Sequence, residues 1–366
     1  MQTKGTVLIG LSGGIDSSVA AWLLKKDGWN VIGATMRIYD GRIPIPETKR
    51  SGCFGPKEIH NIEAARNAAE RLDIPHYCFN LADEYRQFVI DYFRNEYLAG
   101  HTPNPCVHCN QKMKFGFLQE YAAKQGLVFD KFATGHYARI HLNTNNRYSI
   151  LRGKDNAKDQ SYFISYLTQN QLAKLIFPLG DFFKSEIKQI AKRLNWLDLI
   201  ERQESQDFIA CDNYSALFNQ NESKPGCFVN KEGKILGKHK GIIYYTIGQR
   251  KGIGIGGGIP FYVININPQN NTITLGTKED LYANSLTAKD INWVTLPACP
   301  DHPIHITAQI RQRHKAASAT LIKENEDQVR VIFKSPQTAI TPGQIVVFYD
   351  GDTVLGAGTI ATADNV

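Results

Sequence analysis

The sequence predicts an α/β domain built on a parallel sheet, followed by two smaller β-rich domains. Apolar runs alternate with helical stretches through the first half of the chain, as in a parallel sheet covered on both faces. From Gly226 onward, short apolar runs follow one another between turns rich in Asn, Gly and Pro, which is typical of antiparallel β-structure. A chain of 366 residues is long enough for two or three domains.

The first half is expected to contain strands and helices in the following order: Val7–Ile9, the helix 19–26, the strand Asn30–Met36, the helix Glu58–Leu72, the strand His76–Asn80, the helices Ala82–Leu98 and Met113–Gly126, and the strand Lys131–Thr134. Ligands of such sheets bind beyond the carboxyl ends of the strands. Four loops should therefore share one rim: the glycine-rich stretch 10–18, Met36–Arg37, residues 103–110 and Gly135–His136. The basic insertion 42–57, which contains Cys53, is expected to be a flexible excursion near this rim.

The second half begins with a helix at 184–194 and a stretch without clear periodicity at 201–212. The expected strands are Phe261–Ile266, Thr272–Leu275, Ile304–Arg311, Val329–Phe333, Ile345–Tyr349 and Val354–Ile360. Asn270–Asn271 and Asp350–Asp352 are expected to be hairpin turns. The predicted domains are residues 1–206, 207–281 and 282–366, the last a β-barrel.

The composition is ordinary for a soluble globular protein, with 42% hydrophobic and 21% charged residues. No apolar run reaches the length of a membrane span, so no membrane partner is expected. Seven cysteines are too few for a secreted disulfide scaffold of this length, which favours the cytoplasm. A formal net charge of +7 is compatible with a polyanionic partner such as a nucleic acid.

The stretch from Gly10 to Ser18 reads Gly-Leu-Ser-Gly-Gly-Ile-Asp-Ser-Ser and joins a buried strand to a helix. The unpaired N–H groups of a first helical turn and the helix dipole form an anion site, and Gly13 and Gly14 let a phosphate approach closely. The serines can add hydroxyl donors, and Asp16 suits a magnesium ion better than a phosphate. No Gly-Lys-Ser/Thr follows, so this is no Walker loop; the alternative is a tight turn with a serine cap.

The second chemical motif, residues 101–110, places Cys106 and Cys109 in a Cys-x-x-Cys spacing after two prolines. Such a pair serves thiol redox chemistry, half of a metal site, or a nucleophile with a neighbour. A zinc ribbon needs a second pair, which the chain lacks. Lys112, Lys114 and two nearby histidines favour the reactive thiolate, although two inert cysteines in a turn remain the alternative.

The glycine stretch resembles the signature of the PP-loop ATP pyrophosphatases, and nearly the whole chain resembles the bacterial tRNA-specific 2-thiouridylases (the MnmA/TrmU family). The resemblance is carried by separate strings: 10–17, 102–106 with Cys109–Asn110 and Lys114–Phe115, 133–139, 158–163, 237–241, 245–252 and 342–344. It implies a PP-loop (adenine nucleotide alpha hydrolase-like) domain, a small β-rich central domain that contacts tRNA, and a C-terminal β-barrel.

The resemblance implies that ATP adenylates the C2 oxygen of the wobble uridine in a tRNA anticodon, after which sulfur replaces that oxygen to give 2-thiouridine, AMP and pyrophosphate. Cys109 would carry the persulfide sulfur delivered by a donor protein, and a second cysteine would then form a disulfide with it. The residues implied to hold ATP with Mg²⁺ are Gly10, Leu11, Ser12, Gly13, Gly14, Ile15, Asp16, Ser17, Met36 and Gly135. The residues implied to contact tRNA or the target base are Asn104, Pro105, Cys106, His136, Lys158, Asp159, Gln160, Arg311, Gln312 and Gln344.

The sequence departs from the family pattern in two places, at Cys106 and at the position of the second cysteine. Many members have an acidic residue where Cys106 stands, and their second cysteine follows a serine by four residues, whereas here Ser205 plus four is Ile209. Cys211, two positions later, is the expected partner of Cys109, and Cys106 is the alternative. A further alternative joins Cys106, Cys109 and Cys211 as ligands of a [4Fe-4S] cluster that binds sulfide during thiolation of the same uridine.

Two other functions stay open at this stage. A PP-loop ligase that adenylates a small molecule would need neither Cys109 nor the basic strand end at Ile310–Lys315. A non-catalytic RNA-binding module would not need the glycine loop. Pyrophosphate release from ATP that requires tRNA would distinguish all three.

Overall fold

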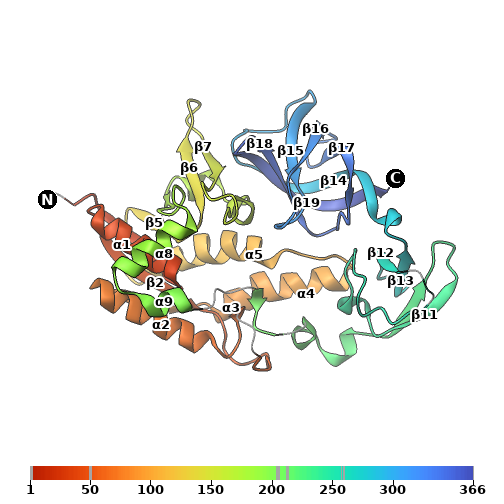
Figure 1. Cartoon of the computed structure of the whole chain (residues 1–366), viewed down its shortest axis with the longest axis horizontal. Coiled ribbons are helices and arrows are strands. Elements are labelled where there is room, and N and C mark those ends of the chain that lie inside the picture. Colours follow the sequence, from red (N-terminus) through yellow and green to blue (C-terminus); the bar gives the residue numbers. More distant parts are fainter. Residues whose placement is uncertain are drawn as a thin grey trace. The chain divides into compact units, whose positions relative to one another are not determined.

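A computed structural model describes residues 3–48, 52–202, 207–211, 214–256, 258 and 260–365. The chain divides into two compact units (Figure 1). The first comprises residues 1–89, 106–213 and 352–354, and the second comprises 90–105, 214–351 and 355–366. The glycine loop and the candidate thiols all belong to the first unit.

The first unit is built on a parallel sheet whose strand order, in the described residues, is β4-β2-β1-β5-β8. Val7, Leu8 and Ile9 of the central strand β1 are all fully buried, as expected for a strand covered on both faces. The strands are β1 (Thr6–Gly10), β2 (Asn30–Arg37), β4 (His76–Asn80), β5 (Lys131–Ala133) and β8 (Leu175–Ile176).

Helices α1, α2, α8 and α9 pack on one face of this sheet in a shared apolar core that includes Val7 and Ile9. Helix α6 packs against β2 and β4, and Phe115 of the preceding π-helix η2 contacts Phe132 of β5. The helix predicted at Glu58–Leu72 and the strand predicted at His76–Asn80 are confirmed with the same bounds. The helices are α1 (Ile15–Lys26), α2 (Glu58–Leu72), α6 (Leu118–Lys124), α8 (Lys184–Arg193) and α9 (Leu197–Glu201).

Two predicted helices contain π-helical turns. Residues 82–98 are helical throughout, as α3, η1 and α4, whereas residues 113–126 correspond to the end of η2 and to α6, which ends at Lys124. Several strands of this unit were not predicted. They are β8 at the edge of the parallel sheet, β3, which lies within the insertion expected to be flexible and pairs in parallel with β9, and β6 and β7, which form a hairpin. The bounds are α3 (Ala82–Tyr85), η1 (Arg86–Ile90), α4 (Asp91–Leu98), α5 (Pro105–His108), η2 (Cys109–Phe117), β3 (Gly52–Phe54), β6 (Ala138–Leu142), β7 (Tyr148–Arg152), η3 (Ser161–Ile164), α7 (Gln169–Leu172) and β9 (Asp207–Ile209).

The second unit contains, in its described part, a four-stranded sheet in the order β11-β10-β13-β12. Its core is formed by Phe228, Val263, Ile273 and Leu275, with Tyr245 and Ile253. The predicted turn at Asn270–Asn271 is confirmed, with Asn271 at φ 50°. The elements are η4 (Tyr214–Leu217), η5 (Gln220–Glu222), β10 (Gly226–Val229), β11 (Ile235–His239), η6 (Ile242–Tyr244), β12 (Tyr262–Asn267), β13 (Thr272–Gly276) and η7 (Glu279–Leu281).

The strands that follow close into an antiparallel barrel in the order β14-β17-β16-β15-β18-β19, because β19 pairs back with β14. This confirms the predicted barrel, although the strand expected at Ile304–Arg311 ends at Gln309, which leaves Arg311 and Gln312 in the following turn. The start of β19, Thr353–Val354, pairs with β7 and belongs to the first unit. The strands are β14 (Tyr282–Trp293), β15 (Ile304–Gln309), β16 (Ala317–Lys323), β17 (Val329–Thr338), β18 (Ile345–Asp350) and β19 (Thr353–Asn365). The boundaries predicted for the three domains (1–206, 207–281 and 282–366) stay a prediction.

None of the helices in the described ranges is long and apolar enough to span a membrane.

Candidate functional site

The glycine loop joins the carboxyl end of β1 to the start of α1. Gly14 is the N-cap of α1, and among the described residues no side chain caps it, which leaves the first-turn N–H groups facing outward as an anion site. Gly13 has φ +71°, and a Cβ there would lie 2.6 Å from Cβ of Ala64 in α2. Only glycine fits at this position, because the backbone is left-handed and packs directly on α2.

The serine hydroxyls mainly hold the loop together. Oγ of Ser17 accepts a hydrogen bond from the Ser12 N–H at 3.2 Å and donates to the Gly14 carbonyl at 3.2 Å. Oγ of Ser18 donates to the same carbonyl at 2.9 Å. Ser17 and Ser18 are buried, whereas Ser12 is exposed. Of the three hydroxyls expected to face a phosphate, Ser12 is the one that the folded loop presents to solvent.

Asp16 is held by Lys184, which none of the sequence motifs contains, and by Tyr137, which lies in the family-like string 133–139. Nζ of Lys184, the first residue of α8, lies 2.7 Å from both carboxylate oxygens, and the Tyr137 hydroxyl donates to Oδ1 at 2.7 Å. The Lys184 side chain is 10% exposed and that of Asp16 is 28% exposed. One carboxylate beside phosphate oxygens is a usual Mg²⁺ arrangement, so Asp16 fits the ion, but the Lys184 ammonium would have to leave one of its oxygens.

The ends of β1, β2 and β5 lie at the same edge of the sheet. The parallel register pairs Gly10 with Ala34 and Ile9 with Ala133. Met36 lies two residues after Ala34, and Gly135 lies two residues after Ala133. A Cβ on Gly135 would lie 2.8 Å from the Ser17 N atom, which shows how closely this loop approaches the start of α1. The structure therefore brings the predicted nucleotide residues together.

His136, predicted to contact tRNA, is only 9% exposed. Its Nδ1 lies 2.6 Å from Oγ1 of Thr134, and its ring packs 5.6 Å from that of Phe115 in η2. Burial, with a smaller effect of the nearby Lys114 ammonium, holds the pKa of His136 well below its usual range. His136 is therefore neutral, and it connects the Gly135 loop to the helix that begins at Cys109.

Cys106 in α5 and Cys109 at the start of η2 are free thiols of intermediate exposure. Burial raises the pKa of Cys109 to about 11, and the Lys114 ammonium offsets only part of that rise. Burial likewise raises the pKa of Cys106. Lys114 thus favours the thiolate of Cys109, as expected, but burial raises the pKa by more than this cation lowers it.

Cys211 is 4% exposed and follows β9 by two residues. The strand pairing of β9 with β3 and a hydrogen bond from the Ala210 N–H to the Phe54 carbonyl (3.0 Å) tie its segment to that of Cys53. Ser205, the reference point for the family's second cysteine, lies outside the described residues.

Cys53, which no sequence motif contains, is exposed; beside the larger effect of burial, a thiolate at Cys53 would raise the pKa of both Cys106 and Cys109. It therefore lies near the pair. Among the described residues, no three His, Cys, Asp or Glu side chains are placed to hold a metal ion. The arrangement thus gives no support to an iron–sulfur cluster on Cys106, Cys109 and Cys211.

Several residues predicted to contact tRNA make internal hydrogen bonds in the first unit. Asp159 accepts from Arg152 Nη1 at 2.8 Å and from the Ser161 hydroxyl at 2.8 Å, and Oε1 of Gln160 accepts from the Tyr137 N–H at 3.0 Å. These side chains shape the loop that follows β7. The structure leaves their contact with tRNA, and that of Lys158, as predictions.

In the second unit, Gln344 Nε2 donates to the carbonyls of Thr102 (2.8 Å) and Pro103 (3.1 Å). Asn104 and Pro105 follow and are buried. Arg311 Nη1 donates to the Thr338 carbonyl at 3.2 Å, and Gln312 is exposed. Gln344 therefore fixes the backbone that leads into the predicted base-contacting residues.

Comparison with known proteins covers nearly the whole chain. The family model of the tRNA methyl transferase HUP domain matches residues 5–211, that of the tRNA methyl transferase PRC-barrel domain matches 215–277, and that of the aminomethyltransferase beta-barrel domain matches 283–360. The tRNA-specific 2-thiouridylase MnmA of Endomicrobium trichonymphae is 48% identical over 364 residues, covering 98% of this chain and 100% of the relative. The proteins of the same name from Clostridium perfringens (strain 13) and Clostridium beijerinckii are 43% and 44% identical, and each comparison covers 98% of this chain and 99% of the relative.

Proposed function

We propose that this chain, which belongs to the family of tRNA-specific 2-thiouridylases, is an ATP-dependent tRNA-uridine 2-sulfurtransferase. The observation that carries the proposal is the loop Thr134–His136, which touches both reactive elements. Gly135 approaches the start of α1 in the nucleotide loop, and His136 packs against Phe115 in the helix that begins at Cys109. An anion site connected in this way to the helix that begins at Cys109 suits a reaction that activates an oxygen with ATP and then replaces it with sulfur.

ATP supplies an adenylyl group, so that the C2 oxygen of the wobble uridine bonds to the α-phosphorus and pyrophosphate leaves. The first-turn N–H groups of α1 would hold the charge of the departing pyrophosphate. Asp16 would hold Mg²⁺ beside those phosphates. Lys184 would keep the Asp16 carboxylate oriented toward the loop.

Cys109 would carry the sulfur as a persulfide formed by a donor protein. Its terminal sulfur would bond to C2 of the base, and AMP would leave with the former C2 oxygen. A second thiol would then attack Sγ of Cys109, forming a disulfide and leaving the transferred sulfur on the base as a thiocarbonyl. An external thiol would reduce that disulfide.

The second thiol is Cys211 or Cys106. Cys211 is buried and follows β9, which pairs with β3, whereas Cys106 lies one helical turn before Cys109. Replacing each by serine distinguishes them, because the variant that lacks the second thiol should accumulate tRNA linked to Cys109 through a disulfide. The cytoplasm, as the compartment of tRNA, is the proposed site of action.

Two matched family models carry a description as tRNA methyl transferase domains, but the chemistry of this site favours sulfur transfer. A methyl transferase has no need for an uncapped glycine loop that suits phosphates or for a Cys-x-x-Cys pair beside it. Thiolation uses both.

The test is a reconstituted assay with the purified chain, anticodon-arm tRNA, ATP, Mg²⁺ and a persulfide donor. We expect pyrophosphate release that depends on tRNA, and 2-thiouridine at the wobble position by mass spectrometry of digested tRNA. Cys109→Ser should release pyrophosphate without forming 2-thiouridine. Pyrophosphate release without tRNA, or 2-thiouridine formed by Cys109→Ser at the wild-type rate, would contradict the proposal, and an iron assay on anaerobically purified protein tests the cluster alternative.

A further inference from the structure

Arg202 connects the glycine loop to α2 through hydrogen bonds to both. It directly follows α9, and its Nη1 donates to the Gly13 carbonyl at 3.3 Å. Its Nη2 donates to Oδ1 of Asn61 at 2.7 Å and to the His60 carbonyl at 3.4 Å. All three acceptors are uncharged oxygens, so these contacts orient the guanidinium, and the nearby Asp198 carboxylate is hydrogen-bonded to Arg71.

The contact with Gly13 fixes the orientation of one peptide group. The peptide bond between Gly13 and Gly14 is trans, so its C=O and N–H point in opposite directions. Because Arg202 holds the Gly13 carbonyl on one side, the Gly14 N–H must face the other side. Glycines on both sides of the bond offer little resistance to a rotation of this peptide, so the orientation depends on the hydrogen bond to Arg202.

We propose that Arg202 is a positioning residue of the nucleotide site, which turns the Gly14 N–H toward the phosphates and adds a positive charge behind the loop. The inference rests on the proposed function, because it assumes that the glycine loop binds ATP. Without the guanidinium, the peptide can rotate and direct its carbonyl oxygen toward the phosphates, which repel it.

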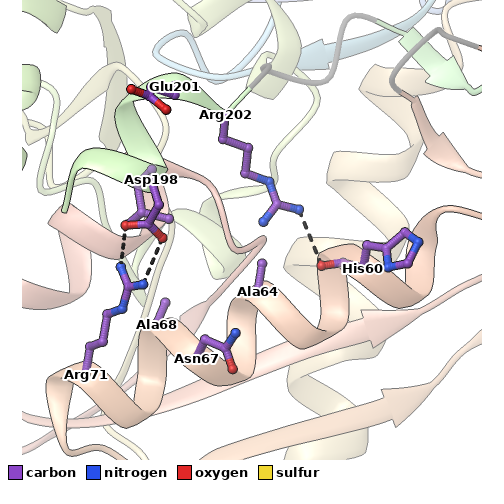
Figure 2. A pocket seen from close by; sticks show the side chains of 9 residues that line it. His60, Ala64, Asn67, Ala68, Arg71, Asp198, Glu201 and Arg202 are labelled. Atoms are coloured by element: carbon purple, nitrogen blue, oxygen red, sulfur yellow. Dashed lines mark hydrogen bonds and ion pairs between the residues drawn. The ribbon is translucent and has the colours of Figure 1, made fainter.

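Arg202 lines a cavity of about 510 Å³ between α2 and α9, together with Arg71 and Asp198. Figure 2 shows Arg202 extending from the end of α9 toward His60, while Arg71 pairs with Asp198 further along α2. Nη1 and Nη2 of Arg71 each donate to one oxygen of the Asp198 carboxylate at 2.8 Å. Arg71 is therefore a matched control, an arginine of the same cavity whose hydrogen bonds go to a carboxylate and not to the glycine loop.

The experiment compares Arg202→Ala, Arg202→Lys and Arg71→Ala with the wild type, by ATP titration calorimetry and by thiolation kinetics. A charged hydrogen bond of this kind changes an equilibrium by about 10- to 100-fold. We therefore expect Arg202→Ala to weaken ATP binding and lower kcat/KM for ATP by about 10- to 100-fold, with KM for tRNA unchanged. Arg202→Lys should lie between, because lysine keeps the charge but lacks the two separate nitrogens that bind Gly13 and Asn61. Arg71→Ala should bind ATP like the wild type.

Guanidinium added to Arg202→Ala provides a second measurement, because the deletion enlarges a cavity that opens to solvent. Recovery of ATP affinity with guanidinium, and none with equal ionic strength of sodium, is expected if the hydrogen bond to Gly13 is what matters. The inference would be overturned if the ATP affinity of Arg202→Ala were within twofold of the wild type, or if Arg71→Ala lost as much ATP affinity as Arg202→Ala. If Arg202→Ala does not fold, wild-type ATP affinity of Arg202→Lys would overturn it. A wild type that binds ATP but does not thiolate tRNA would count against the proposed function alone, since the binding comparison still decides the role of Arg202.

Discussion

Glu58, the first residue of α2, should make the stability of the first unit depend on pH. Its carboxylate accepts hydrogen bonds from the N–H groups of Ile38 (2.7 Å) and Tyr39 (2.9 Å), immediately beyond the end of β2. Burial raises the pKa of Glu58 from 4.5 to about 7, more than these hydrogen bonds lower it. Between pH 4.5 and about 7, Glu58 is therefore protonated in the folded state and ionised in the unfolded state.

The sign and size follow from proton linkage. The contribution of Glu58 to stability is fully present below pH 4.5 and is lost as the pH rises through 7, since the folded state then has to bury a charge. At 1.36 kcal/mol per unit, this shift corresponds to about 3 kcal/mol in total, of which about 2.5 kcal/mol falls between pH 5 and 8. Glu58→Gln removes the ionisation, so the stability difference between wild type and variant should change by that amount across this interval.

Urea unfolding at several pH values, followed by tryptophan fluorescence, measures this difference. Of the four tryptophans, Trp22, Trp29 and Trp196 lie in the first unit and report mainly on it. Glu70→Gln, an exposed substitution on the same helix, is the control and should leave the pH profile unchanged. If wild type and Glu58→Gln lost stability in parallel from pH 5 to 8, the linkage argument would be refuted.

Three further predictions concern other contacts. Lys184→Met should destabilise the first unit by about 3 kcal/mol in urea unfolding, because it leaves the half-buried Asp16 carboxylate without its cation, whereas the exposed Lys188→Met should cost little. The rate at which iodoacetamide alkylates Cys109 should rise about tenfold per pH unit to well above pH 9, because a pKa of about 11 leaves roughly one thiolate in 10,000 at pH 7. A rate that levels off below pH 9 would contradict this. Gln344→Ala removes two hydrogen bonds to the backbone before Asn104 and should destabilise the second unit by about 1–2 kcal/mol, lowering the thiolation rate while ATP affinity, measured by calorimetry, stays constant.

Sequence reasoning was most successful where the relevant physics is local. The periodicity of Glu58–Leu72 and the position of the glycine turn depend on neighbouring residues, and both are found where expected. The β6–β7 hairpin could have been predicted in the same way, since residues 138–152 hold two apolar runs around Asn145–Asn146, and Asn146 adopts the left-handed backbone of such a turn.

The contacts that organise the site were not predictable because they join distant parts of the chain. Asp16 and Lys184 are 168 residues apart, and Gln344 lies 242 residues from Thr102. No local pattern marks Lys184 as different from the other lysines of its helix. The same limit applies to the thiols, because the sequence shows the neighbouring lysines but not the burial that opposes them.

The raised pKa of Cys109 also bears on the order in which substrates bind. To accept sulfur, the thiol must lose its proton and attack the donor persulfide, and tRNA phosphates bound nearby would raise its pKa further. We therefore expect sulfur loading to precede tRNA binding, and tRNA added first to slow the formation of the Cys109 persulfide. Mass spectrometry of the protein after brief exposure to the donor, with and without tRNA, measures this rate. The slowing should weaken at high salt, which screens the phosphates, and faster loading in the presence of tRNA would show that tRNA brings a base or a conformational change that outweighs its charge.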